Sequence, residues 1–187
     1  MNRKKFASLI IVVVGLLICT CLCVSAAATY TKGYYQKTVY IQNLATGFYK
    51  TAVDSAVSTW NSSGIYPRSI VINNLSSSGV YDDDFTGSSL SRYNDSWGVY
   101  MQLGTMSTCP CHTTGLFSIF LNNQLLDSST CESTAAHELG HALGLDEDQS
   151  SNLRLMSYSR DKTTVRAPIR DEVLSVVQLW EYYHGHD

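Results

Sequence analysis

The sequence contains little charge and few residues that break regular structure. Only 16% of its 187 residues are charged, and the formal net charge is −3. There is no basic run outside Arg3, Lys4 and Lys5, which argues against a protein that binds the phosphate backbone of a nucleic acid. Three prolines and 44% apolar residues exclude a disordered or collagen-like chain. Without an internal repeat or a proline-rich linker, this length predicts a single domain besides any targeting segment.

The first 28 residues have the pattern of a signal peptide. Three basic residues precede an apolar run, Phe6–Val24, and Ser25–Ala28 then supply the small residues that signal peptidase accepts. A run of about 19 apolar residues is also near the length of an uncleaved membrane anchor. We expect cleavage, which leaves a secreted domain over residues 29–187; retention would instead attach that domain to a membrane.

Cysteines are scarce in the part of the chain that export would leave. Three of the six lie inside the apolar run, so only Cys109, Cys111 and Cys131 remain. In an oxidising compartment Cys131 can pair with either Cys109 or Cys111, which would close a loop of about 20 residues. The sequence does not distinguish between these two pairings.

The order of periodic segments predicts an α+β domain in which a mixed sheet packs against helices. Strands are expected at residues 34–41, 69–75, 98–103 and 116–122, helices at 44–60, 132–143 and 168–183, and a long polar surface loop at 76–96. The order of the strands within the sheet cannot be predicted from these patterns.

The chemically specific part of the sequence is the segment TAAHELGHALGLDED, residues 134–148. His137 and His141 are four residues apart, so on a helix they share one face and can place imidazole nitrogens on one cation. Glu138 stands beside the first histidine, where its carboxylate can reach water at the metal without being a ligand. That is the position of a general base in a metal-dependent hydrolase.

Gly144 has a mechanical role in this interpretation. If the helix continued, Glu147 would lie about 9 Å beyond His141 along the axis and could not reach the same metal. A glycine can adopt the left-handed conformation that ends a helix, and the chain can then turn back to supply a third ligand. Glu147, Asp146 and Asp148 are all candidates for that ligand.

Two motifs in this order resemble those of the metzincin clan of metallopeptidases, particularly its matrixin-type members. HELGHALGLDE resembles the extended zinc-binding motif of the clan, and Leu155–Tyr158, with the sequence LMSY, resembles its Met-turn. The resemblance implies a mixed twisted sheet with a long first helix, an active-site helix and a C-terminal helix. It also implies one catalytic Zn²⁺ held by His137, His141 and Glu147, although the clan has His or Asp where this chain has Glu147.

The same resemblance implies roles for further residues. Met156 would pack beneath the metal ligands, and Tyr158 would ligate zinc or stabilise the oxyanion. The acidic run Asp82–Asp84 could bind Ca²⁺, as many matrixin-like domains do.

The sequence therefore predicts a secreted, monomeric zinc metalloendopeptidase that hydrolyses protein or peptide substrates. An extended substrate would lie against the strand at residues 116–122, pairing its backbone with the edge of the sheet. The alternative is a catalytically weak or inactive protein of the same fold that binds partners after secretion or at a membrane surface. Between residue 28 and the first helix there is no cysteine, and so no candidate there for a matrixin-type latency switch.

Overall fold

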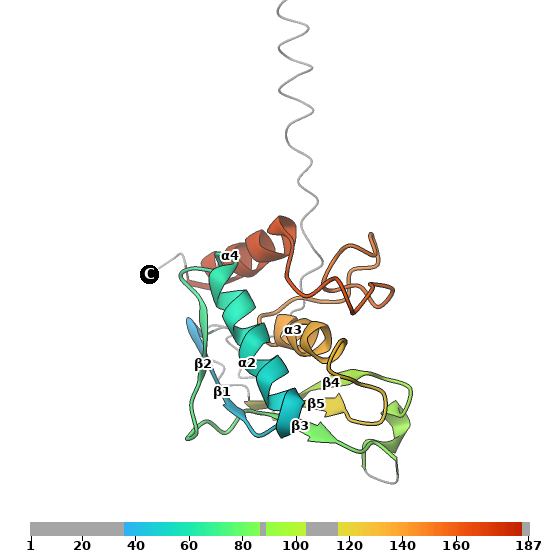
Figure 1. Cartoon of the computed structure of the whole chain (residues 1–187). Helices are drawn as coiled ribbons and strands as arrows, with labels where there is room; N and C mark the ends of the chain where they lie inside the picture. The colour runs from blue at the N-terminus through green and yellow to red at the C-terminus, as the bar shows by residue number, and fades with distance from the viewer. Residues whose placement is uncertain (1–35, 87–88, 104–115, 185–187) are drawn as a thin grey trace, which may run out of the picture.

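The structure is a computed structural model that describes residues 36–86, 89–103 and 116–184 (Figure 1). The predicted signal peptide, Cys109 and Cys111 lie outside these ranges. The elements are β1 (Thr38–Asn43), α2 (Gly47–Ser62), β2 (Ser69–Ile72), β3 (Gly79–Asp83), the 3₁₀ turn η1 (Ser91–Tyr93), β4 (Gly98–Leu103), β5 (Leu116–Asn122), α3 (Cys131–Ala142) and α4 (Arg170–His184). The expected α+β architecture is confirmed, with a long first helix, a second helix that carries both histidines, and a C-terminal helix.

The strands form a five-stranded mixed sheet in the order β2-β1-β3-β5-β4. Neighbouring strands run parallel except β4, which pairs with β5 in antiparallel orientation. This order corrects one expectation from the sequence. The strand at residues 116–122 is β5, which has β3 on one side and β4 on the other, so its backbone has no free edge for a substrate. The edge strand beside α3 is β4.

The sequence also wrongly predicted a continuous loop at residues 76–96. β3 lies inside this range and is the central strand of the sheet, pairing with β1 on one side and β5 on the other. Its sequence, GVYDD, is short and half polar, so no local periodicity marks it as a strand. The pairing is decided by neighbours that are distant in the chain, and Val80, only 1% exposed, provides its buried contact.

α2 and α3 lie side by side on one face of the sheet (Figure 1). The buried face of α2 consists of Ala52, Val53, Ala56, Val57 and Trp60. The indole nitrogen of Trp60 donates a hydrogen bond of 2.8 Å to the carbonyl oxygen of Ala136, in the middle of α3. Because a buried indole N–H needs an acceptor, this bond sets how the two helices meet. It is one of the contacts that hold α3 in this orientation against α2.

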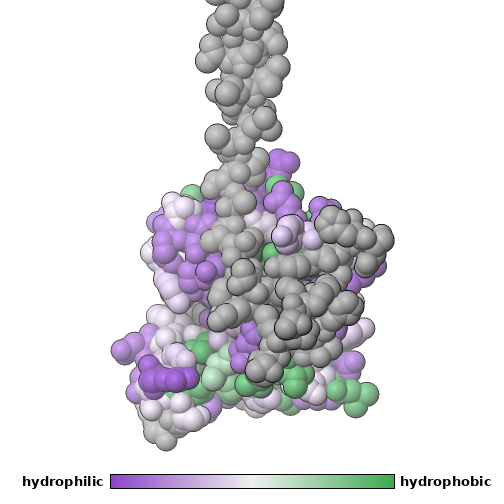
Figure 2. Space-filling model, turned by 180° about the vertical axis from the view of Figure 1, so that it is seen from behind, coloured by the Kyte–Doolittle hydropathy of each residue, from purple (hydrophilic) through white to green (hydrophobic). Residues whose placement is uncertain are grey.

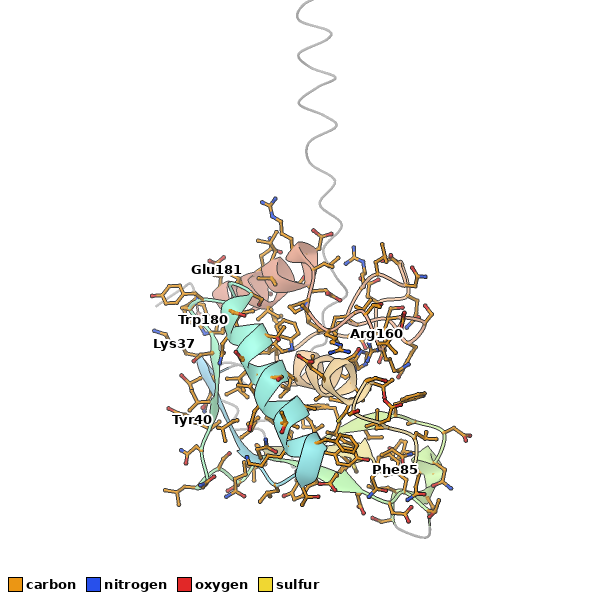
Figure 3. All side chains as sticks on the ribbon, in the orientation of Figure 1. Lys37, Tyr40, Phe85, Arg160, Trp180 and Glu181 are labelled. Carbon is orange, nitrogen blue, oxygen red and sulfur yellow. The ribbon has the colours of Figure 1, made fainter. Side chains whose placement is uncertain are left out.

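A second, smaller hydrophobic cluster secures the segment between β3 and β4. Phe85, Leu90 and Val99 are buried together there, and Tyr93 and Phe120 pack against them. Figure 3 shows Phe85 at the lower right of the molecule, on the opposite side from β1 and β2. Packing in this cluster holds residues 93–97, which lead into β4 and border the site described below.

The acidic run at residues 82–84 is engaged by the chain itself. The carboxylate of Asp82 accepts hydrogen bonds from the backbone N–H and the hydroxyl of Thr46, just before α2, and Asp84 does the same for Thr86. Such contacts are typical of turns and helix starts. Calcium binding at Asp82–Asp84 stays a prediction.

Cys131, at the start of α3, is a free and fully buried thiol, so the disulfide predicted for it is not found in the structure. Burial, with the nearby charge of Asp82, raises the pKa of this thiol to about 12. A thiol with so little thiolate is a packing group in this position rather than a reactive one.

The outer surface differs between the two ends of the molecule. Viewed from behind, the upper part of the described surface is mainly hydrophilic, and hydrophobic residues gather in the lower part, where the sheet lies (Figure 2). The large exposed apolar side chains of the strands are Tyr40, Val71, Ile72, Leu103 and Leu116.

Within residues 36–86, 89–103 and 116–184, no helix combines the length and apolar content that crossing a bilayer would require.

Candidate metal centre

The two histidines of α3 are held by backbone carbonyls. The Nδ1–H of His137 donates to the carbonyl oxygen of Leu155 at 2.8 Å, and the Nδ1–H of His141 donates to that of Leu145 at 2.9 Å. A carbonyl can only accept, so each ring carries a proton on Nδ1, which leaves Nε2 as the nitrogen that can bind a cation. The rings meet edge to face with centroids 4.8 Å apart, and both are largely buried.

The helix that carries them ends just before Gly144, as the sequence predicts. Gly144 has φ of 98°, its N–H bonds to the carbonyl oxygen of His141, and the N–H of Leu145 bonds to that of Gly140, both at 3.0 Å. This is the Schellman pattern, which satisfies the last carbonyls and reverses the chain. The reversal brings the following acidic residues back toward the histidines.

Of the three acidic candidates, Glu147 is the one that reaches both histidines. Its Oε1 lies 3.1 Å from Nε2 of His137 and 3.2 Å from Nε2 of His141. Asp146 lies at the rim, where its carboxylate accepts the backbone N–H of Glu147. Asp148 is buried and points away, forming an ion pair of 3.1 Å with Arg154. The turn after Gly144 thus assigns a different partner to each carboxylate.

The three donor atoms fit a zinc ion. One ligand atom from each of His137, His141 and Glu147 lies within 4.8 Å of the other two, and among the residues that the structure describes no other group of three His, Cys, Asp or Glu is gathered in this way. Two imidazole nitrogens and one carboxylate oxygen form a donor set typical of catalytic zinc. The carbonyls on Nδ1 are the outer contacts that orient metal-binding histidines.

The charges of these groups stabilise one another. Burial alone would raise the pKa of Glu147, but hydrogen bonds with both histidines outweigh it and lower that pKa to about 2. Burial would also lower the pKa of His141, yet its bond to Glu147 and the charge of Glu138 raise it above the ordinary value. Glu147 is therefore an anion at any physiological pH, which suits a cation ligand.

Met156 packs against α3 at Gly140, one residue before His141. Its side chain is fully buried, and a Cβ added to Gly140 would collide with its sulfur. The absent side chain at Gly140 therefore lets the turn pack directly against α3. The backbone of Met156 is held as well, since its carbonyl oxygen accepts the N–H of Asp148 at 2.8 Å.

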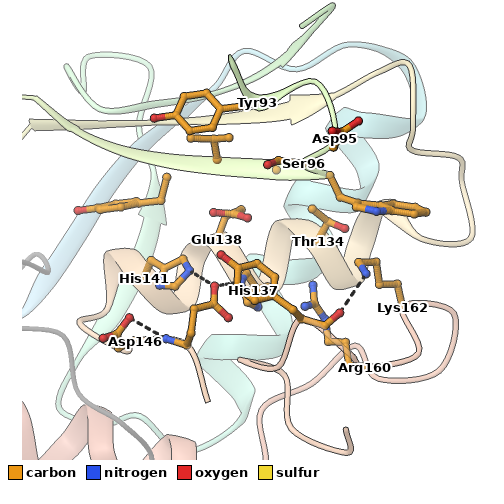
Figure 4. Close-up of a pocket in the computed structure, with 16 residues that line it drawn as sticks. Tyr93, Asp95, Ser96, Thr134, His137, Glu138, His141, Asp146, Arg160 and Lys162 are labelled. Carbon is orange, nitrogen blue, oxygen red and sulfur yellow. Dashed lines mark hydrogen bonds and ion pairs between the residues drawn. The ribbon is translucent and has the colours of Figure 1, made fainter. Parts of the chain in front are cut away.

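Glu138 lies beside the metal ligands but outside their group. It is 5% exposed and lines the same cleft as the histidines, against the start of β4 (Figure 4). A Cβ on Gly98 would come within 2.8 Å of its Oε1, so the strand can approach this carboxylate only because residue 98 is glycine. The sequence identified Glu138 but gave no signal for Gly98.

Tyr158 stands at the opening of the cleft. It is 67% exposed, and its ring centroid is 5.9 Å from that of His137. Partial burial, together with the nearby carboxylate of Glu147, raises its pKa to about 12. Its hydroxyl therefore keeps its proton at neutral pH and can donate a hydrogen bond into the cleft.

The cleft itself has a volume of about 530 Å³ and lies between β4 with the segment before it and the chain from Asp146 to Lys162. Two cations that no sequence motif indicates, Arg160 and Lys162, line its lower wall in the view of Figure 4. Arg160 is buried and donates to the carbonyl oxygens of Ser157 and Ser133, which ties the Met-turn to α3. The ammonium of Lys162 lies 4.7 Å from the ring centroid of Trp97, so this cation–π contact bridges the two walls.

No protein-family model matches the sequence, and no curated protein matches it. Among solved structures, the chain is similar to high choriolytic enzyme 1, a hatching enzyme zinc-protease from Oryzias latipes (medaka fish), with 14% sequence identity and a TM-score of 0.49. The similarity covers 84% of this chain and 99% of that one.

Proposed function

We propose that this chain is a secreted zinc-dependent metalloendopeptidase of the metzincin type that its motifs resemble. The observation that supports the proposal is the convergence of two imidazole Nε2 atoms and one carboxylate oxygen in an open cleft that also contains Glu138. His137, His141 and Glu147 would hold the ion. Zn²⁺ bound there supplies a Lewis acid that polarises a peptide carbonyl and lowers the pKa of water.

Glu138 is the proton carrier in this proposal. Its carboxylate accepts one proton from water as the water oxygen bonds to the carbonyl carbon of the scissile peptide. When the carbon–nitrogen bond breaks, the same group gives that proton to the departing amine, so Glu138 ends in its starting form. Its confinement between α3 and Gly98 limits the positions that the carboxylate can take during both transfers.

The substrate would bind as an extended strand along β4. This strand is at the edge of the sheet, and its first residues line the cleft above the histidines. An added strand would obtain backbone hydrogen bonds from that edge, and the cleft walls would select its side chains. Tyr158, with its proton retained, is placed to donate to the carbonyl oxygen as negative charge develops on it.

Replacing Glu138 tests the proposal. The chain recovered from the culture medium, which is expected to start near residue 29, should contain one zinc ion and cleave an unfolded protein. Glu138→Ala should keep the zinc and lose cleavage by about 10²-fold or more, because proton transfer by a positioned group contributes about that much.

Glu132→Ala is the matched control for this substitution. Glu132 lies in the same helix but pairs with Arg166 at 3.3 Å, away from the cleft, so its loss should leave turnover unchanged. If Glu138→Ala cleaves as fast as the parent, Glu138 is not the proton carrier. A wild-type chain with bound zinc and no turnover would instead favour the inactive binding protein.

A further inference from the structure

The peptide group between Leu155 and Met156 is hydrogen-bonded at both ends by ionisable side chains. Its carbonyl oxygen accepts the Nδ1–H of His137 at 2.8 Å, and its N–H donates to Oε1 of Glu172 at 2.8 Å. A carboxylate on the N–H polarises the peptide, which makes the carbonyl oxygen a stronger acceptor. The charge of Glu172 therefore acts on the imidazole of His137 across one peptide bond.

Glu172 is unusual for a glutamate in its surroundings. It is 0% exposed and forms no ion pair with a lysine or arginine in the described ranges, although the buried Arg160 is near enough for the two charges to interact. Its second oxygen, Oε2, accepts the N–H of Ile169 at 2.8 Å, just before α4. A glutamate can close the start of a helix at the surface, without the desolvation cost of full burial. A separate role for Oε1, the oxygen that accepts the N–H of Met156, would explain why this charge is buried.

We propose that Glu172 is a positioning residue of the metal centre. Through the Leu155–Met156 peptide it holds His137 in the Nδ1–H form, fixes the orientation of the ring, and strengthens Nε2 as a donor to the ion. Carboxylates in direct contact with ligating histidines have this effect, and here one peptide group stands between the two. The inference rests on the proposed function, because it assumes that His137 binds a metal.

The two oxygens of Glu172 accept different N–H groups, so two variants can separate this role from capping of α4. In Glu172→Gln the shape is kept, but the amide NH₂ cannot accept, so one of the two backbone N–H groups loses its partner and the charge is gone. In the control, Ile169→Pro, the N–H that Oε2 accepts is removed while the carboxylate and its bond to Met156 remain. Both changes weaken the start of α4, but only the first acts on the peptide.

The test is the affinity of the full chain for Zn²⁺, measured by competition with a chelator. Glu172→Gln should weaken binding by about 10-fold or more, the usual range for a partner of a ligating histidine. Ile169→Pro should stay within about twofold of the parent at a comparable loss of thermal stability. Equal affinities for Glu172→Gln and the parent, or equal losses in the two variants, would overturn the inference. A parent chain that binds no zinc would overturn the proposed function and this inference together.

A second measurement needs no variant and applies even if Glu172→Gln does not fold. Binding of Zn²⁺ at Nε2 makes the Nδ1–H of His137 a stronger donor, which should strengthen the bond from Met156 N–H to Glu172 as well. In NMR spectra of the parent chain, the amide proton of Met156 should therefore move downfield on addition of Zn²⁺. The amide of Ile169, on the other oxygen of the same carboxylate, should move much less. Equal shifts, or an upfield shift at Met156, would contradict the relay.

Discussion

The three consecutive acidic residues that follow α3 have three different partners. Glu147 contacts both imidazoles, Asp146 accepts the next backbone N–H, and Asp148 pairs with the buried Arg154. From the sequence, all three were candidates for the third ligand. What separates them is the direction of each side chain after the turn at Gly144, and this depends on Arg154, a partner that no local pattern reveals.

This division of roles predicts opposite effects for two neighbouring substitutions. Glu147→Ala removes a ligand and should weaken zinc binding by more than about 100-fold, beyond the range seen for supporting residues. Asp148→Ala should leave zinc affinity nearly unchanged but lower the free energy of unfolding by about 1–3 kcal/mol, because among the described residues Arg154 then keeps only Asp171 as an ion-pair partner. Chelator competition and urea denaturation on both variants measure these effects. Loss of zinc binding in Asp148→Ala would show that the third ligand is assigned wrongly.

The helix end at Gly144 is the element on which the site depends most. A non-glycine residue at φ of 98° is strained, and left-handed backbone costs about 1–2 kcal/mol. We expect Gly144→Ala to lose about that much stability and also to weaken zinc binding, since any relaxation of the turn displaces Glu147. Gly64 also has a positive φ, of 96°, but lies far from the site in sequence, after α2. Gly64→Ala is therefore the control, with a similar loss of stability and unchanged zinc affinity.

Elements with a strong local pattern could be predicted from the sequence, and those decided by distant contacts could not. β4 and β5 have the predicted bounds, and α3 begins one residue earlier than expected. β3 was missed because its five residues carry no periodicity, although they pair with two strands in the centre of the sheet. The site follows the same rule. One motif predicts the roles of His137, Glu138 and His141. Gly98, Arg160 and Glu172 belong to no motif, and their roles follow from contacts that form only in the folded chain.

At the scale of the whole molecule, the site joins segments from both halves of the chain. α3 supplies the histidines, β4 supplies one wall of the cleft, the chain between α3 and α4 supplies the floor, and α4 supplies the buried carboxylate of Glu172. A core that links α2, α3 and the sheet holds these segments together. The free energy of unfolding of the zinc-free chain should therefore depend on the charges of the side chains at the site.

The pKa shifts of Glu147 and His141 give the sign of this pH dependence. The pKa of Glu147 falls from 4.5 to about 2 on folding, so its contribution is present above pH 4.5 and is lost as pH falls toward 2. The pKa of His141 is raised above 6.5, so its contribution is complete below pH 6.5 and is lost as pH rises through the folded value.

In the zinc-free chain, the stability advantage of the parent over Glu147→Gln should therefore be greatest between about pH 4.5 and 6.5 and smaller on either side. Urea denaturation of both proteins across this range measures the difference. A difference that stays constant with pH would show that the carboxylate and the imidazoles are not coupled.

The most direct test of the proposed zinc site is a crystal structure of the zinc-loaded chain with anomalous data collected at the zinc edge. If the proposed site is correct, the map contains one strong peak, about 2.0–2.2 Å from Nε2 of His137, Nε2 of His141 and a carboxylate oxygen of Glu147. Glu138 should lie beside the ion without ligating it. A peak ligated by Asp146 or Asp148 in place of Glu147, or no peak between the two histidines, would contradict the proposed site.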